Sequence, residues 1–250
     1  MADTEAGMTA PLWPARGEIH ILHFTLSLSD PELLFCEQIL ATDELQRADR
    51  LLSRQVRDRF VAGRAFLRRT LARCLNLDPA HVCLSSSKHG KPRLAGEQAR
   101  IGLSFNLSHS EDRAILALAQ GCEVGVDIEH VREDLPFRAM AQHFFSLREQ
   151  TELFSLLPEL QLAAFYRGWT RKEACLKGCG SGFAEPATCC YVSLLPNHTS
   201  ALLECSTNRQ GADRWHLTDI AVPDGFCAAL AHNGIVPVRL QSSDWHSKTF

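Results

Sequence analysis

A short apolar segment with two acidic residues on one side constrains this chain most. Residues 123–129 read EVGVDIE, in which valines and an isoleucine alternate with Gly125, Asp127 and Glu129. Side chains two apart in a strand point to the same face, so the two carboxylates share one side of a buried strand. Such neighbours raise each other's pKa unless a cation intervenes, and Mg²⁺ often joins carboxylates to substrate phosphates. The pattern predicts a divalent-cation site; the alternative is a solvated strand end with salt-bridged acids.

A downstream helix offers a third acid. Residues 160–178 are expected to form a long helix, in which Trp169, Glu173 and Lys177 step by four and lie along one face. One interpretation is a surface ion pair, because Glu173 and Lys177 stand in the favourable i,i+4 order. The other is that Glu173 joins the two strand carboxylates while Lys177 holds a phosphate one turn further on.

Two more segments carry polar residues at predicted turns or strand ends. Residues 105–110, FNLSHS, present Ser108 and His109 where a strand ends. The G-x-S-x-G elbow of serine hydrolases is absent, and small polar residues at a strand end also suit phosphate binding. Lys91 stands between a glycine and a proline, so a stiff loop presents one lysine; by itself this loop is an ordinary turn.

Composition excludes several classes of protein. The 250 residues are 45% hydrophobic and 22% charged, which is ordinary for a globular protein. The net charge of −3 shows no basic excess, so nucleic-acid binding is not expected. No apolar stretch reaches the roughly 20 residues of a membrane span. The first 17 residues lack the charged start and apolar run of a secretory signal, so we expect a cytoplasmic protein whose ten cysteines are reduced.

The order of expected elements predicts an α+β fold with two similar α/β halves. Helices are expected from Ser29-Asp30-Pro31 onward and at 54–75, 136–145, 146–156 and 160–178. Strands are expected at 18–28, 80–84, 101–106, 113–119 and 123–129, and in YVSLL, ALLEC, WHLTDIAV and FCAALAH between 190 and 236. The halves would be 18–122 and 123–236, between a poorly ordered N-terminus, 1–17, and a tail, 237–250, without a packing signal.

Taken together, these segments resemble the 4′-phosphopantetheinyl transferases of the Sfp type. That family has a G-x-D-x-E strand followed by a W-x-x-K-E-A-x-x-K helix, which match residues 125–129 and 169–177. Its GKP loop, phosphate motif and F-S-x-x-E element match residues 90–92, 105–110 and 145–149. Single motifs of this length are common by chance, but five in the family's order are a specific signal.

The resemblance implies a pseudo-dimeric monomer with coenzyme A in the cleft between its halves. Mg²⁺, or Mn²⁺ as an alternative, would be held against the pyrophosphate by Asp127, Glu129 and Glu173. Lys177 would touch the phosphates of the arm, and Glu173 would take the proton of the attacking serine, directly or through water. The remaining expected contacts are with the nucleotide: Lys91 and His109 at the 3′-phosphate, Ser108 nearby, and Arg47 and Arg59 close to the nucleotide. One further basic position of the family falls near Glu44 here.

The implied reaction transfers the 4′-phosphopantetheine arm of coenzyme A to a serine of an apo acyl- or peptidyl-carrier protein and releases adenosine 3′,5′-bisphosphate. Enzymes of this kind serve secondary metabolite biosynthesis, among other pathways. The arginine-rich helix face at 54–73 would dock acidic carriers or simply face solvent. Two alternatives remain: a Mg²⁺-dependent nucleotide phosphohydrolase, and an inactive homologue that binds coenzyme A.

Overall fold

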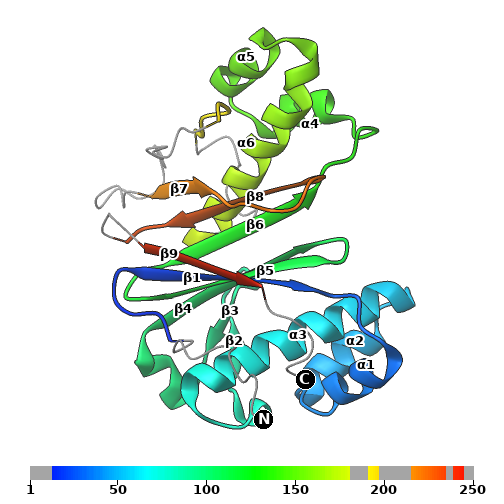
Figure 1. Cartoon of the computed structure of the whole chain (residues 1–250), viewed down its shortest axis with the longest axis vertical. Helices are drawn as coiled ribbons and strands as arrows, with labels where there is room; N and C mark the ends of the chain where they lie inside the picture. The colour runs from blue at the N-terminus through cyan, green and yellow to red at the C-terminus, as the bar shows by residue number, and fades with distance from the viewer. Residues whose placement is uncertain (1–12, 181–190, 197–214, 235–238, 245–250) are drawn as a thin grey trace, which may run out of the picture.

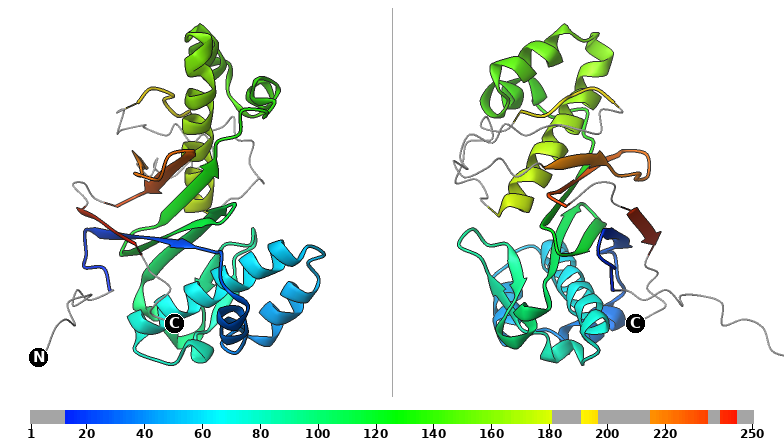
Figure 2. Two further views of the ribbon diagram at one scale, coloured as in Figure 1. Left: turned by 45° about the vertical axis from the view of Figure 1, so that its right-hand side comes forward. Right: turned by 90° about the vertical axis from the view of Figure 1, so that its left-hand side faces the viewer.

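The computed structural model describes residues 13–180, 191–196 and 215–234, and the backbone of 239–244. Two sheets lie between helices at the two ends of the molecule, as Figures 1 and 2 show. The first sheet has the strand order β4-β5-β1-β9 and the second the order β6-β8-β7, while β2 and β3 form a separate hairpin. The described elements therefore mix helix and sheet, as the sequence predicts.

The elements of the first sheet and its helices occupy residues 18–120. They are β1 (Glu18–Thr25), α1 (Asp30–Glu37), α2 (Thr42–Asp49), α3 (Arg54–Leu75), β2 (Leu84–Ser86), β3 (Pro92–Leu94), β4 (Leu103–Ser110) and β5 (Arg113–Gln120). Two 3₁₀ turns, Pro79–His81 and Gly96–Ile101, complete this part.

The remaining elements build the second sheet and close the first. They are β6 (Val124–His130), α4 (Phe137–Phe144), α5 (Leu147–Ser155), α6 (Pro158–Cys179), β7 (His216–Asp219), β8 (Phe226–His232) and β9 (Arg239–Asp244). The last strand, β9, pairs in parallel with β1. No pattern after residue 236 had indicated this strand.

Three apolar cores explain the layered arrangement. The first lies between α3 and one face of the first sheet, where Phe66 stacks on Phe24. The second packs α6 against the outer face of the second sheet. The third fills the space between the sheets and includes Val124, Val126 and Ile128. This confirms that the apolar side chains of β6 face away from the side that carries Asp127.

The long helices follow the sequence pattern closely, and two short strands do not. The helix predicted at 54–75 spans those residues, and the one predicted at 160–178 begins at Pro158 and ends before Gly180. The strand predicted at 80–84 is wrong, because a 3₁₀ turn occupies its start and β2 begins only at Leu84. The strand predicted in YVSLL is also wrong, and ALLEC lies outside the described residues.

A ladder of side-chain hydrogen bonds joins β4 to β6, the neighbouring edges of the two sheets. Alternate residues of β4 point towards β6, as the two-residue period of a strand requires. Four of them make these bonds: Ser104 Oγ donates to Glu123 Oε2 (3.2 Å), Asn106 Oδ1 accepts from the Val126 amide (2.8 Å), Ser108 Oγ donates to Asp127 Oδ1 (2.9 Å), and Ser110 Oγ donates to Glu129 Oε2 (2.9 Å) and accepts from the His130 amide (3.0 Å). We call this set the β4–β6 ladder.

Gly125 allows α6 to approach β6 closely. A Cβ atom at this position would overlap the carbonyl oxygen of Ala174 and the amide of Gly178, both in α6. Because those atoms are backbone, no side-chain rotation could relieve the overlap. The glycine thus sets the distance between the strand that carries Asp127 and the helix that carries Lys177.

The Gly125→Ala variant is expected to lower the free energy of unfolding by about 1–3 kcal/mol, since overpacking at a close contact forces a backbone shift. Gly63→Ala is the matched control: Gly63 lies within helix α3, and its Cβ would meet only the side chains of Leu26 and Leu107, at 3.6 Å or more. There alanine should stabilise the chain by about 0.5–1 kcal/mol through helix propensity. Urea denaturation of both variants checks this; equal stability of Gly125→Ala and wild type would contradict the close-contact argument.

Candidate active site

Asp127 is the most deeply buried acid of the site. It is 2% exposed, and its Oδ1 atom accepts hydrogen bonds from Ser108 Oγ at 2.9 Å and from Lys177 Nζ at 2.5 Å. Its other oxygen, Oδ2, is buried and has no hydrogen-bond partner among the described residues. Burial raises the pKa of Asp127, and the Lys177 ammonium counteracts that rise. The carboxyl group thus retains an unmet demand for positive charge.

Glu173 and Glu129 share this electrostatic environment. Burial, and then the charges of Asp127 and Glu129, raise the pKa of Glu173 to about 7, although Lys177 works in the opposite direction. Burial and the charge of Asp127 also raise the pKa of Glu129, whose Oε2 accepts a hydrogen bond from Ser110 Oγ at 2.9 Å. The charges of these carboxyl groups therefore interact, and their role as a set of ligands stays a prediction.

The carboxylate oxygens of Asp127, Glu129 and Glu173 are ligands of the kind that a hard cation prefers. Within the described part of the chain, the Lys177 ammonium contacts Asp127. Among the described residues, no group of three or more histidine, cysteine or acidic side chains is arranged to hold a metal ion. Even so, an unpartnered buried Asp127 oxygen, all-oxygen ligands and three raised carboxyl pKa values fit Mg²⁺, which prefers carboxylate oxygens.

Ser108 and His109 lie on opposite faces of β4. Ser108 is buried and forms a triangle with Asp127 and Lys177, whose Nζ donates to Ser108 Oγ at 2.9 Å. His109 is exposed on the face towards α3. Partial desolvation, followed by the charges of Lys177 and Arg59, lowers the pKa of His109, so its ring is neutral at neutral pH.

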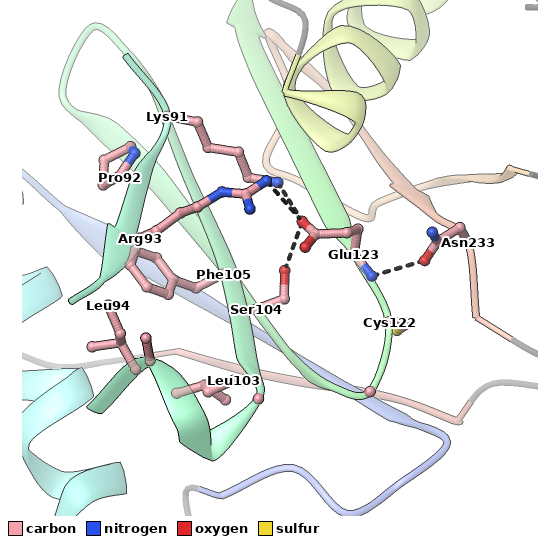
Figure 3. A pocket seen from close by; sticks show the side chains of 13 residues that line it. Lys91, Pro92, Arg93, Leu94, Leu103, Ser104, Phe105, Cys122, Glu123 and Asn233 are labelled. Atoms are coloured by element: carbon pink, nitrogen blue, oxygen red, sulfur yellow. Dashed lines mark hydrogen bonds and ion pairs between the residues drawn. The ribbon is translucent and has the colours of Figure 1, made fainter. Parts of the chain in front are cut away.

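Lys91 turns inwards instead of projecting from its loop. Its ammonium donates to Glu123 Oε2 (3.0 Å), the Val124 carbonyl (3.0 Å) and the Gly178 carbonyl (3.1 Å). Figure 3 shows Lys91 reaching Glu123 beside a pocket of about 500 Å³. Lys91 also lines a second pocket, of about 360 Å³, together with Glu173 and Lys177. Lys91 therefore lies between two pockets.

The arginines near α2 and α3 are largely paired within the chain. The Arg47 guanidinium lies over the Phe60 ring, 5.3 Å from its centroid, and Arg59 donates to Glu111 at 2.8 Å. Glu44, which stands where the resemblance would place a basic residue, is buried and accepts from Arg68 at 2.5 Å. Intramolecular ion pairs thus account for much of the charge on this helix face.

A buried ion pair joins α6 to α5, and the sequence analysis had not predicted it. Lys172, 1% exposed, lies 2.9 Å from Glu149, which also accepts from the Ser146 and Val192 amides. The signal was present in the S-x-x-E spacing, which is a helix capping box. The sequence analysis also did not predict that Asn106 and Ser110 would join β4 to β6.

The site combines buried carboxylates that lack positive charge with a lysine, a serine hydroxyl and an adjoining pocket. Such groups can bind a phosphate through the ammonium and a cation through the carboxylates. In the described part of the chain, no helix is long and apolar enough to cross a membrane.

Family comparisons identify the chain. Residues 27–121 match the model of the 4′-phosphopantetheinyl transferase N-terminal region, and residues 123–231 match the model of the 4′-phosphopantetheinyl transferase superfamily. The chain therefore belongs to the 4′-phosphopantetheinyl transferase superfamily and is an enzyme of that class.

Named relatives agree with this assignment. 4′-Phosphopantetheinyl transferase HetI of Nostoc sp. strain PCC 7120 is 34% identical over 229 residues, 92% of each chain. 4′-Phosphopantetheinyl transferase AcpT of Escherichia coli K12 is 42% identical over 121 residues, 48% of this chain and 57% of the relative. The human L-aminoadipate-semialdehyde dehydrogenase-phosphopantetheinyl transferase is 30% identical over 164 residues, 62% of this chain and 52% of the relative.

The raised pKa of Glu173 predicts a pH-dependent stability. Its folded pKa of about 7 exceeds its ordinary value of 4.5, so between these values the folded state binds more protons than the unfolded state. The free energy of unfolding must then fall as pH rises through that window. With a metal chelator present, wild type should lose about 1–3 kcal/mol relative to Glu173→Gln between about pH 5 and pH 8. Urea denaturation at each pH measures this difference; parallel curves for the two proteins would exclude it.

Proposed function

We propose that this enzyme transfers the 4′-phosphopantetheine arm of coenzyme A to a serine of an apo acyl- or peptidyl-carrier protein, in the manner of the Sfp type. The observation that carries the proposal is the cluster of Asp127, Ser108, Lys177 and Glu173 beside a pocket of about 360 Å³. Membership of the transferase superfamily supports the reaction class.

The three carboxylates Asp127, Glu129 and Glu173 would hold Mg²⁺, or Mn²⁺ in its place. When bound, such an ion neutralises negative charge on the pyrophosphate of coenzyme A and so favours departure of the leaving group. The unpartnered Asp127 oxygen and the raised carboxyl pKa values support this ligand set.

Each side chain of the cluster has its own role in the transfer. The Lys177 ammonium orients a phosphate oxygen of the arm, and Ser108 holds Lys177 and Asp127 in position. The carrier serine oxygen forms a bond to the β-phosphorus, and the bond from that phosphorus to the bridging oxygen breaks. Adenosine 3′,5′-bisphosphate leaves with the electron pair. Glu173 accepts the serine proton, directly or through water; without a bound cation its pKa is about 7, and a cation held by the same carboxylate would lower that value.

The nucleotide would be bound by basic residues of β4, α2 and α3. His109 and Arg47 are exposed and can meet the 3′-phosphate and its surroundings, with Arg59 nearby once it exchanges Glu111 for substrate. Lys91 was expected at the same phosphate, but its ammonium already has three partners within the chain.

We further infer that residues 18–122 and 123–236 are two similar halves of a pseudo-dimer within one cytoplasmic monomer. In support, each half contributes an antiparallel sheet covered by a single helix of 22 residues, α3 or α6. Association of the halves would bring β4 and β6 together at the active site.

Mass spectrometry of apo carrier proteins incubated with coenzyme A and Mg²⁺ tests the transfer. We expect the carrier to gain the mass of one phosphopantetheine group at its serine. Release of inorganic phosphate without a carrier would instead indicate a nucleotide phosphohydrolase. Calorimetric binding of coenzyme A without any carrier modification would indicate an inactive homologue. A panel of acyl and peptidyl carriers, tested side by side, would identify the preferred substrate.

Two substitutions test the site within that assay. Glu173→Gln removes the proposed base, and Asp127→Ala removes the buried acid that aligns Lys177. Each should lower the transfer rate by at least about 10²–10³-fold, because electrostatic groups of this kind contribute that much. Glu159→Gln is the control, since it alters an exposed acid on the same helix. Circular dichroism must show that all three variants remain folded; wild-type turnover in either site variant would refute the assignment.

A further inference from the structure

The environment of Lys91 differs from that of a lysine that binds a diffusible ligand. Its side chain is 6% exposed, although it belongs to a turn whose neighbours His89 and Gly90 are exposed. A lysine ammonium has three N–H donors, and three acceptors lie at 3.0–3.1 Å from it. Its hydrogen-bonding capacity is therefore used within the chain.

The acceptors of Lys91 lie at the two elements that build the active site. The Gly178 carbonyl belongs to the last turn of α6, one residue after Lys177. The Val124 carbonyl begins β6, three residues before Asp127. A cation near the carbonyl end of a helix is favourable because it meets the negative end of the helix dipole. One ammonium thus fastens the end of α6 to the start of β6.

We propose that Lys91 is a positioning residue that clamps α6 to β6 and so aligns Lys177 with Asp127, and that it does not bind the 3′-phosphate of coenzyme A. The inference rests on the proposed function for its kinetic tests, but its structural test does not. It reassigns the lysine of the GKP loop from ligand binding to the alignment of the catalytic residues.

A phosphate contact would carry a cost that the clamp avoids. If the ammonium turned to a ligand, the buried Val124 and Gly178 carbonyls would each lose this donor, and leaving buried acceptors without partners is unfavourable. Arg93 could not replace it readily, because its side chain is 51% exposed and its nearest nitrogen comes no closer to Glu123 than 3.8 Å. The exposed cations of the region, and not Lys91, are then left to meet the nucleotide.

Hydrogen exchange tests the clamp without any assay of activity. In the full-length protein without ligand, Lys91→Met should accelerate amide exchange in residues 174–180 relative to wild type. Lys88→Met is the matched control, because Lys88 is an exposed lysine of the same turn, and it should leave exchange in that segment unchanged. Unchanged exchange in Lys91→Met would overturn the proposal.

The comparison of coenzyme A with 3′-dephospho-coenzyme A tests the alternative role. If Lys91 met the 3′-phosphate, Lys91→Met would erase much of the enzyme's preference for coenzyme A. The clamp predicts that the ratio of kcat/KM for the two substrates stays as in wild type, while kcat falls by about 10- to 100-fold through misplacement of Lys177. These rates are compared at a temperature at which thermal melts show each variant to be fully folded. A collapse of the substrate preference would overturn the proposal.

Arginine provides a second discrimination. The planar guanidinium binds phosphate well but cannot direct donors to three buried acceptors as an ammonium does. Lys91→Arg should therefore resemble Lys91→Met in kcat. Recovery of wild-type kcat and KM in Lys91→Arg would favour a phosphate contact and overturn the clamp.

Glu123→Gln gives opposite expectations for the two roles. Loss of the carboxylate charge would release a phosphate-binding lysine and lower the KM for coenzyme A. The clamp predicts no fall in KM, a lower kcat, and no additional loss of kcat when Glu123→Gln is combined with Lys91→Met, because coupled residues are non-additive. A lower KM in Glu123→Gln would overturn the proposal. If the wild-type enzyme transfers no phosphopantetheine arm, the proposed function is wrong. The hydrogen-exchange experiment would still show whether Lys91 holds α6 against β6.

Discussion

The β4–β6 ladder is the interaction on which the rest of the structure depends. In the described residues, β4 pairs through its backbone only with β5, and β6 only with β8, so the facing edges of the two sheets meet through side chains. Small polar residues at alternate positions of β4 satisfy the edge of β6 and hold its carboxylates in place. The same contacts therefore join the sheets and shape the candidate active site, which explains why that site lies at their junction.

Burial of acids at this junction creates an electrostatic imbalance that the chain corrects only in part. Lys177 offsets the burial of Asp127 only in part, and all three carboxyl groups, Asp127, Glu129 and Glu173, keep raised pKa values. A fully compensated site would be more stable and would have less affinity for an additional cation or a base function. The residual negative charge is a stability cost of the kind expected where a protein prepares for ligand and proton transfer.

Local patterns predicted the long helices and the shared face of Asp127 and Glu129, because both follow from the periods of helix and strand. The predictions that failed concern segments whose conformation depends on long-range contacts. The backbone at Val192 and Leu194 forms no strand because its amides bond to Glu149 and Glu152 of α5, which no local pattern reveals. The inward orientation of Lys91 likewise depends on Glu123 and Gly178, residues far away in sequence. Motifs proposed the candidate site residues, whereas only the fold showed which of them contact one another.

The position of β9 has a consequence for how the chain folds during synthesis. This strand covers the outer edge of β1, although all the other described elements lie between β1 and β9 in the sequence. The first sheet therefore cannot be completed until those elements have been synthesised. Until then β1 is an uncovered edge, and such edges promote association between nascent chains. Pairing with β9 thus covers this edge late in synthesis. Completion of the first sheet therefore depends on a segment that follows the second sheet in the sequence.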